Sequence, residues 1–355
     1  MQLNLLLRQQ FVLLVRVLRL VPHPVYLPGV VGGMTSRAPG RHHKVQGNEE
    51  HQVKAINAVG LVKAYSATPV LQGIDLSVEA GAVVALLGPN GAGKTSLVEI
   101  LEGHRMRTGG HLSVLGLDPA DRRDFRLLRR RMGVVLQQTM LEPGISSRDL
   151  LRRQASYYAH PMDLGEVLRK VGLEDKQNGL VRTLSGGMRR RLDIALALVG
   201  HPEILFLDEP TTGLDPLSRR NIRELIREVN SSGTTVILTS HDLDEVQDLA
   251  DTIHVLAAGQ FIASGSPENI IAGSHSTTQV RFLLSGIEQA SLPTGGQVSG
   301  GFVHYETHDQ DQLMAALQRW SSETDQPIQG LTVIPPSLDD AYANLLEPAA
   351  TTGGK

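Results

Sequence analysis

The fold is decided by the stretch "VVALLGPNGAGKTSL", residues 83–97. It begins as an apolar run, passes through a Gly-rich segment that fits G-x-x-x-x-G-K-[ST], and continues into a helical apolar stripe. In such a strand–loop–helix unit, backbone N–H groups can curl around a phosphate and the helix start adds its positive dipole end. Lys94 is expected to reach the β- and γ-phosphates, and Thr95 to bind Mg²⁺. The sequence therefore predicts a polyphosphate-binding loop made of Gly88, Pro89, Asn90, Gly91, Ala92, Gly93, Lys94, Thr95 and Ser96.

The composition is that of an ordinary globular protein. Of the 355 residues, 41% are hydrophobic and 36 are glycine, and this length predicts about two domains. The 34 Lys and Arg nearly balance the 37 Asp and Glu, and aromatic residues make up 4%. Neither a basic surface nor stacking aromatics therefore favour a nucleic-acid partner. The absence of cysteine excludes disulfides, thiolate metal sites and cysteine nucleophiles.

Residues 1–52 differ in character from the rest of the chain. Residues 3–21 are largely apolar, but Arg8, Arg16 and Arg19 interrupt them, which disfavours both a spanning helix and a secretory signal. An amphipathic surface helix stays open as an alternative. We favour an appendage or a true translation start at Met34, followed by a polar linker.

From residue 53 onward, short β-branched runs alternate with helical periodicity, which is typical of an α/β fold with a parallel sheet. We expect buried strands at 83–87, 133–136, 204–207 and 235–239. Residues 147–179 carry no strand signal, and their helical apolar spacing predicts an inserted helical subdomain. Apolar stripes predict further helices at 97–101, 192–199 and 222–229.

Two acidic residues follow the strand predicted at 204–207. Side chains alternate along a strand, so we expect Asp208 to face a metal ion and Glu209 to face an attacking water. His241 follows the strand predicted at 235–239 and should reach the same carboxyl edge of the sheet. Together with Lys94, these residues predict a site for phosphoryl transfer to water.

Between these elements lies "LSGGMRRRL", residues 184–192. The ordered set of phosphate loop, "LSGG", "LDEP", "GLD" and a following His resembles the nucleotide-binding domain of ATP-binding cassette (ABC) transporters, over residues 53–271. This resemblance implies a P-loop NTPase core with an antiparallel β subdomain and a helical subdomain at 138–184. It also implies that the ligands are ATP and Mg²⁺ and that the cassette is a competent ATPase.

The resemblance further implies roles for individual residues. Tyr65 would stack on adenine, and Gln137 would contact Mg²⁺ and the water, with Gln138 as the rival assignment. Asp215 in "GLDP" would cross the interface between two copies, which would enclose two ATP molecules. The signature that would close over the nucleotide of the second copy is Ser185, Gly186, Gly187 and Met188.

The remaining residues, 274–355, are expected to form a small α+β accessory module after the cassette at 53–273. Strands are predicted at 279–284 and 330–334, and they flank a helix whose stripe includes Leu313, Leu317 and Trp320. A final helix should begin at Ser337, with Asp340 completing a capping box. This tail resembles the accessory tails of drug- and antibiotic-exporting cassettes.

Together, these patterns predict an ATPase subunit that energises export of a small molecule (a drug, an antibiotic or a lipid-like compound) through a separate membrane permease. We expect the subunit to pair with a second copy of itself at the cytoplasmic face of the membrane, without nucleic acid. Two alternatives stay open. One is a soluble ABC-type ATPase that acts on the ribosome or DNA, and the other is the ATPase of an importer.

Overall fold

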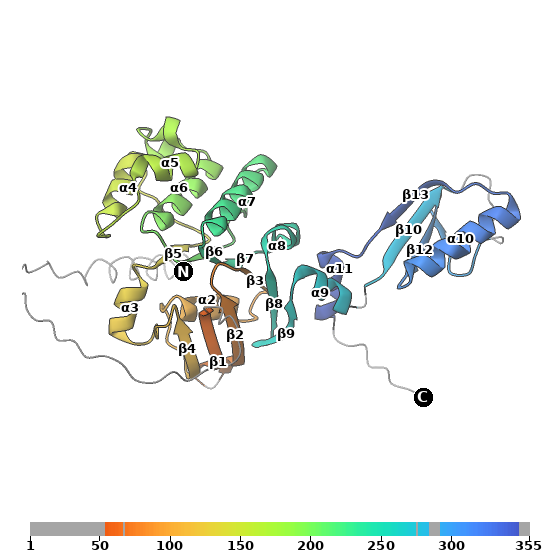
Figure 1. The fold of residues 1–355 in the computed structure, drawn as a ribbon, viewed down its shortest axis with the longest axis horizontal. Helices are drawn as coiled ribbons and strands as arrows, with labels where there is room; N and C mark the ends of the chain where they lie inside the picture. Colours follow the sequence, from red (N-terminus) through yellow and green to blue (C-terminus); the bar gives the residue numbers. More distant parts are fainter. Residues whose placement is uncertain (1–53, 67, 275, 284–291, 348–355) are drawn as a thin grey trace, which may run out of the picture. The chain divides into compact units, whose positions relative to one another are not determined.

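The computed structural model describes residues 54–66, 68–274, 276–283 and 292–347. Its central layer is a six-stranded sheet in the order β5-β6-β7-β3-β8-β9 (Figure 1). The first five strands of this order pair in parallel, and β9 joins β8 antiparallel. The strands are β3 (Val83–Leu87), β5 (Met132–Val135), β6 (Ile204–Asp208), β7 (Thr235–Thr239), β8 (Thr252–Ala257) and β9 (Gln260–Gly265). The four strands predicted for a parallel sheet are confirmed.

A second, antiparallel sheet has the order β2-β1-β4. It consists of β1 (Lys54–Tyr65), β2 (Thr68–Glu79) and β4 (Gly109–Val114). Buried residues of β1 and β2 share one core with β3, β6 and the helix α2 (Lys94–Leu101). Leu97 and Leu101 of α2 are fully buried in that core, which anchors the helix between the two sheets. The antiparallel β subdomain is thus confirmed, and the short helix α3 (Arg122–Leu128) follows it.

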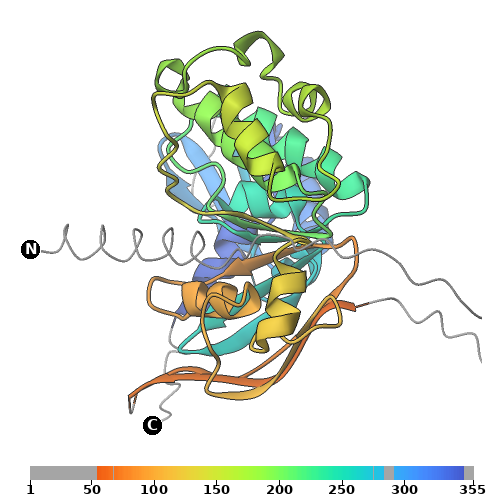
Figure 2. The same ribbon diagram turned by 90° about the vertical axis from the view of Figure 1, so that its left-hand side faces the viewer.

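The segment between β5 and β6 folds into helices, as predicted. They are α4 (Ser147–Ala155), α5 (Leu164–Lys170), the 3-10 turns η1 (Glu174–Lys176) and η2 (Val181–Thr183), and α6 (Gly186–Leu198). Ser146 and Asp163 cap α4 and α5 by accepting hydrogen bonds from backbone N–H groups three residues on. Figure 2 shows these yellow to green helices gathered together. Their apolar stripes form one core with α7 (Pro216–Ser231) and the central sheet.

Two helices, α8 (Leu243–Leu249) and α9 (Pro267–Gly273), precede a small C-terminal sheet. The sheet has the order β11-β12-β10-β13 and shares a core with α10, in which Phe282, Tyr305 and Trp320 are buried. Strands β10 and β13 were predicted, whereas β11 and β12 were not. The bounds are β10 (Thr278–Leu283), β11 (Gln297–Ser299), β12 (Phe302–Thr307), α10 (Gln310–Thr324) and β13 (Gln329–Ile334).

The last helix, α11 (Leu338–Leu346), begins with the predicted capping box of Ser337 and Asp340. Its buried residues Leu338 and Ala341 pack with Val246 of α8 and Ile270 of α9. The chain therefore leaves the cassette to form the small sheet and returns to it with α11. The domain boundary at 273/274 stays a prediction.

The interpretations of residues 1–52, including the amphipathic helix and the start at Met34, lie outside the described residues. Within the described ranges, no helix combines the length and apolarity that crossing a membrane requires.

We predict that Asp193 on α6 makes stability depend on pH. Burial raises the pKa of its carboxyl to about 7 despite the nearby charges of Arg190 and Arg189, and its Oδ1 is buried without a hydrogen-bond partner. The unfolded chain releases this proton near pH ~4. Folding therefore retains a proton between pH ~4 and ~7, and the free energy of unfolding falls as pH rises through that window.

Asp193→Asn should remove the fall in the free energy of unfolding that this carboxyl causes between pH ~4 and ~7. At pH 8 the variant should have the higher free energy of unfolding, measured by urea denaturation. The exposed Asp175 provides a control, because Asp175→Asn should leave the pH profile as in the wild type. Identical profiles for the wild type and Asp193→Asn would contradict the prediction.

Candidate nucleotide-binding site

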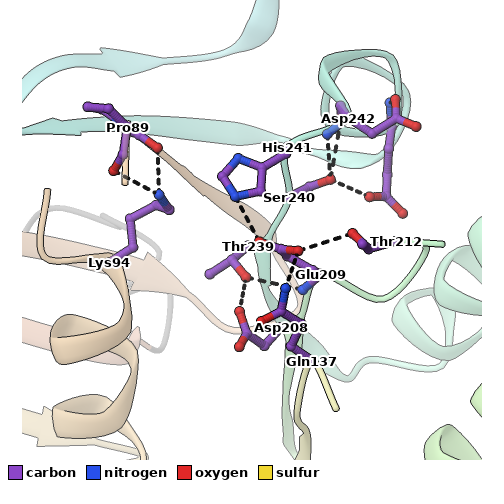
Figure 3. A network of polar contacts seen from close by, with 12 residues as sticks. Pro89, Lys94, Gln137, Asp208, Glu209, Thr212, Thr239, Ser240, His241 and Asp242 are labelled. Carbon is purple, nitrogen blue, oxygen red and sulfur yellow. Dashed lines mark hydrogen bonds and ion pairs between the residues drawn. The ribbon is translucent and has the colours of Figure 1, made fainter. Parts of the chain in front are cut away.

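The predicted phosphate loop joins β3 to α2 and depends on glycine at its end. Gly93 caps α2 with φ 111°, and a Cβ there would lie 2.9 Å from Leu71 Cδ2. Both the backbone conformation and the space therefore require glycine. The ammonium of Lys94 donates hydrogen bonds to the carbonyl oxygens of Gly88 and Pro89, at 2.5 and 3.1 Å (Figure 3). The lysine side chain thus bends back over the loop that precedes it.

Glu209 is the centre of the polar network beyond the end of β6 (Figure 3). Its Oε1 lies 2.8 Å from Nε2 of His241. Its Oε2 accepts hydrogen bonds from Gln137 Nε2 at 2.7 Å and from Thr212 Oγ1 at 3.1 Å. Three residues predicted from separate segments, Gln137, Glu209 and His241, are therefore in direct contact. A carboxylate held by three polar neighbours is well placed to orient and deprotonate a water molecule.

Asp208, the neighbour of Glu209, has different partners. The hydroxyl of Thr239 donates to Oδ1 of Asp208, and the backbone N–H of Glu209 donates to the same hydroxyl at 3.2 Å. This contact follows from the register of the parallel pair, in which Asp208 stands beside Thr239. The two adjacent carboxylates thus have separate environments, as the alternation along the strand predicts.

A cavity of about 470 Å³ brings these groups together, a volume in the range of about 300–1,000 Å³ that is typical of small-molecule sites. Gln137 lines it, and the rival Gln138 does not. Gly88, Pro89 and Ala92 belong to the loop but lie outside the lining. The hydroxyl of Tyr65 lies 3.1 Å from Ser96 Oγ. The lining residues are Tyr65, Val70, Asn90, Gly91, Gly93, Lys94, Thr95, Ser96, Gln137, Asp208, Glu209, Thr239 and His241.

Charges of both signs meet in this cavity. Burial lowers the pKa of Lys94 from its ordinary value, while the carboxylates of Glu209 and Asp208 act in the opposite direction. The ammonium group of Lys94 can bind phosphate oxygens. The hydroxyl of Thr95, the amide of Gln137 and the carboxylate of Asp208 offer the oxygen ligands that Mg²⁺ prefers. The residues present therefore fit a magnesium–polyphosphate ligand.

The signature residues and Asp215 do not line the cavity of their own chain. Ser185 caps α6 by accepting a hydrogen bond from the Met188 N–H at 3.2 Å, and Asp215 caps α7 in the same way. Ser185 and the glycine after it are exposed. A Cβ on Gly187 would lie 2.4 Å from Ser218 Oγ, so this glycine lets the start of α6 meet α7. The N-terminus of α6 is thus open to a ligand or partner outside its own cavity.

Three residues of the site were missed in the sequence analysis: Val70, Thr239 and Thr212. Thr239 ends a predicted strand, but its place beside Asp208 depends on strand order and register, which the sequence pattern does not specify. Thr212 lies three residues after Glu209, and at this spacing a hydroxyl commonly reaches back across a turn. That spacing was the one local signal that could have identified it.

Comparisons with known proteins agree with this geometry. The ABC transporter family model matches residues 71–212. The daunorubicin/doxorubicin resistance ATP-binding protein DrrA of Streptomyces peucetius is 42% identical over 218 residues, which are 60% of this chain and 66% of that protein. The linearmycin resistance ATP-binding protein LnrL of Bacillus subtilis is 34% identical over 67% of this chain and 77% of its own length. The Nod factor export ATP-binding protein I of Rhizobium johnstonii is 33% identical over 82% and 94%, respectively.

Solved structures of cassettes share the fold. The structure of cbiO1 from Clostridium perfringens, described as part of the ABC transporter complex cbiONQ, has a TM-score of 0.56 and 30% identity over 62% of this chain and 91% of its own. The dimeric post-hydrolysis state of the ATP-binding cassette MJ0796, bound to ADP and Pi, has a TM-score of 0.54 and 25% identity over 59% and 98%. The fold, the relatives and the cavity that brings together the phosphate loop, the two carboxylates and His241 agree. The chain belongs to the ATP-binding proteins of ABC transporters.

Proposed function

We propose that this chain is the ATP-hydrolysing subunit of an exporter and energises the movement of a small molecule through a separate membrane permease. The observation that carries the proposal is the contact of Glu209 with both Gln137 and His241, beside the cavity that Lys94 lines. This is the arrangement that hydrolysis needs, because it places a base next to a phosphate site. The relatives are named for daunorubicin/doxorubicin resistance, linearmycin resistance and Nod factor export. They support a drug, an antibiotic or a lipid-like compound as the exported substrate.

In the proposed reaction, a water molecule attacks the γ-phosphorus, the bond to the bridging oxygen breaks, and ADP leaves. Lys94 and the loop N–H groups bind the phosphates, and Glu209 accepts the proton of the attacking water. His241, which reaches Glu209 through Nε2, fixes the γ-phosphate against that water. Thr95, Asp208 and Gln137 would hold Mg²⁺, which would neutralise charge on the phosphate oxygens. Tyr65, 38% exposed beside the cavity, stacks on the adenine.

The proposed active form is a symmetric pair of copies. Its support is that Ser185 and Gly186 are exposed at the start of α6 and away from their own cavity. A helix N-terminus that carries a serine hydroxyl suits a phosphate supplied by another chain. In this arrangement residues 185–188 of each copy cover the ATP of the other, and Asp215 lies at the seam. The pair works on the permease at the cytoplasmic face of the membrane.

Glu209→Gln should lower ATP turnover by ~10²–10⁴-fold, because the amide cannot accept the proton of the attacking water. The ATP affinity, measured by equilibrium binding of a fluorescent ATP analogue, should stay near the wild-type value. Glu203→Gln is the matched control, because Glu203 forms an exposed ion pair with Arg131 away from the cavity. Near-normal hydrolysis by Glu209→Gln would refute the assignment of the base.

Lys94→Ala should abolish ATP binding or turnover, because the loop then lacks the cation that faces the phosphates. Binding and turnover are measured as above. Lys170→Ala serves as the control, since Lys170 lies near Glu228 at 3.9 Å and does not line the cavity. Unchanged affinity and rate in Lys94→Ala would contradict the phosphate-loop assignment.

The paired form should accumulate when ATP binds but is not hydrolysed. Sedimentation analysis of Glu209→Gln with Mg²⁺ and ATP should show a dimer, and adding Ser185→Arg should return it to a monomer. Ser156→Arg, at another exposed position, should leave the dimer intact. A strictly monomeric Glu209→Gln protein at saturating ATP, also in the presence of its permease, would overturn the paired mechanism.

A further inference from the structure

Arg190, on the first turns of α6, makes three hydrogen bonds to main-chain carbonyl oxygens. Its Nη1 donates to Leu136 O at 2.5 Å, its Nη2 to Asp208 O at 2.7 Å and its Nε to Pro210 O at 2.9 Å. The side chain is buried, with 7% of its surface exposed. A buried guanidinium that donates hydrogen bonds to three separate peptide groups fixes those groups relative to one another.

These three carbonyl groups belong to the neighbours of the proposed catalytic residues. Leu136 directly precedes Gln137, while Asp208 and Pro210 stand on either side of Glu209. Arg190 itself does not line the cavity. We propose that Arg190 is a positioning residue for ATP hydrolysis: it holds the main chain on both sides of Glu209 and next to Gln137, so that their side chains keep the orientation in which they meet. The inference rests on the proposed function of this site.

The backbone of Glu209 needs such support. Its φ is 46°, in the left-handed region that is unfavourable for a residue with a side chain. Its N–H donates to Thr239 O at 3.0 Å, which fixes the residue from the β7 side. From the α6 side, Arg190 binds the carbonyl of the peptide group before Glu209 and the carbonyl of the next residue, Pro210. Without the guanidinium, the carbonyls of Asp208 and Pro210 would each lose one hydrogen bond. The backbone of Glu209 could then relax to a more favourable conformation.

A lysine cannot replace this arginine. Its ammonium group is a single point donor, whereas the planar guanidinium presents donors in fixed directions to three carbonyls at once. Burial lowers the pKa of Arg190, and the carboxylates of Asp193, Asp208, Glu245 and Glu209 act to raise it. The side chain remains cationic, because arginine keeps its proton in proteins.

The test compares Arg190→Lys and Arg190→Gln with a control on the same helix, Arg191→Lys. Arg191 donates to the carbonyls of Val171 and Gly172, in the helical subdomain. The full chain is assayed below each variant's unfolding temperature for kcat of ATP hydrolysis and for Kd of a fluorescent ATP analogue. Both Arg190 variants should lose about 10- to 100-fold in kcat, a part of what loss of the base itself would cost. Their Kd should stay within about twofold of the wild type, and Arg191→Lys should keep its kcat.

A double-variant cycle separates positioning of Glu209 from a general structural effect. On the Glu209→Gln background, Arg190→Lys should lower the residual turnover by less than about threefold, because there is no base left to orient. The inference would be overturned if the fold loss in kcat of the double variant equalled the product of the two single losses. It would also be overturned if the kcat of Arg190→Lys stayed within about twofold of the wild type. If Glu209→Gln alone hydrolyses ATP normally, the proposed function fails instead. A loss in Glu209→Gln without a loss in the Arg190 variants refutes the positioning role alone.

Discussion

Parallel pairing of β3, β6 and β7 is the constraint on which the whole site depends. In that pairing Leu86 stands beside Thr239, and Thr239 stands beside Asp208. Three segments far apart in the chain therefore end at one edge of the sheet, where the phosphate loop, the two carboxylates and His241 follow them. The strands are buried on both faces, so a slip of one residue would exchange the side chains that pack in the two cores and would turn the carboxylates away from the cavity. The packing of the core thus determines which functional groups meet at this edge of the sheet.

The same edge concentrates negative charge, and cations on opposite sides balance it. Lys94 lines the cavity with Asp208 and Glu209, whereas Arg190 meets the main chain of these residues from α6. Neither cation forms a direct ion pair with Glu209 among the contacts of the described residues. The carboxylate is instead held by an imidazole, an amide and a hydroxyl. These neighbours orient the carboxylate without an ion pair to Lys94 or Arg190, which leaves its oxygens in place to accept a proton from water.

Local signals in the sequence were sufficient for the parts of the site that lie within one strand–loop–helix unit. The run at 83–87 and the loop up to Thr95 could be assigned because apolar continuity, glycine spacing and the helical stripe coincide. The contacts of Thr239 and Arg190 could not be predicted, since they depend on strand register and on how α6 packs. Strand β12 was missed for another reason: its buried residues Val303 and Tyr305 alternate with the partly buried Phe302 and His304, so the apolar–polar alternation of a half-buried strand is weak. Sequence patterns thus identified the chemistry and two of the groups that orient Glu209, Gln137 and His241, but not the contacts that depend on strand register and helix packing.

In the proposed mechanism, helix α6 has two tasks: it contacts the second copy and it positions Glu209. The helix begins at Gly186, directly after the exposed Ser185, and Arg190 lies about one turn further along. In the proposed pair, the N-terminus of this helix contacts the nucleotide of the other copy. Arg190 binds the main-chain carbonyls on both sides of Glu209 in its own copy. The intrahelical hydrogen bonds of α6 link these two points within one regular segment. In the proposed pair, a movement of α6 on closure would therefore act on the guanidinium that binds the carbonyls of Asp208 and Pro210, which links the position of the signature to the orientation of Glu209.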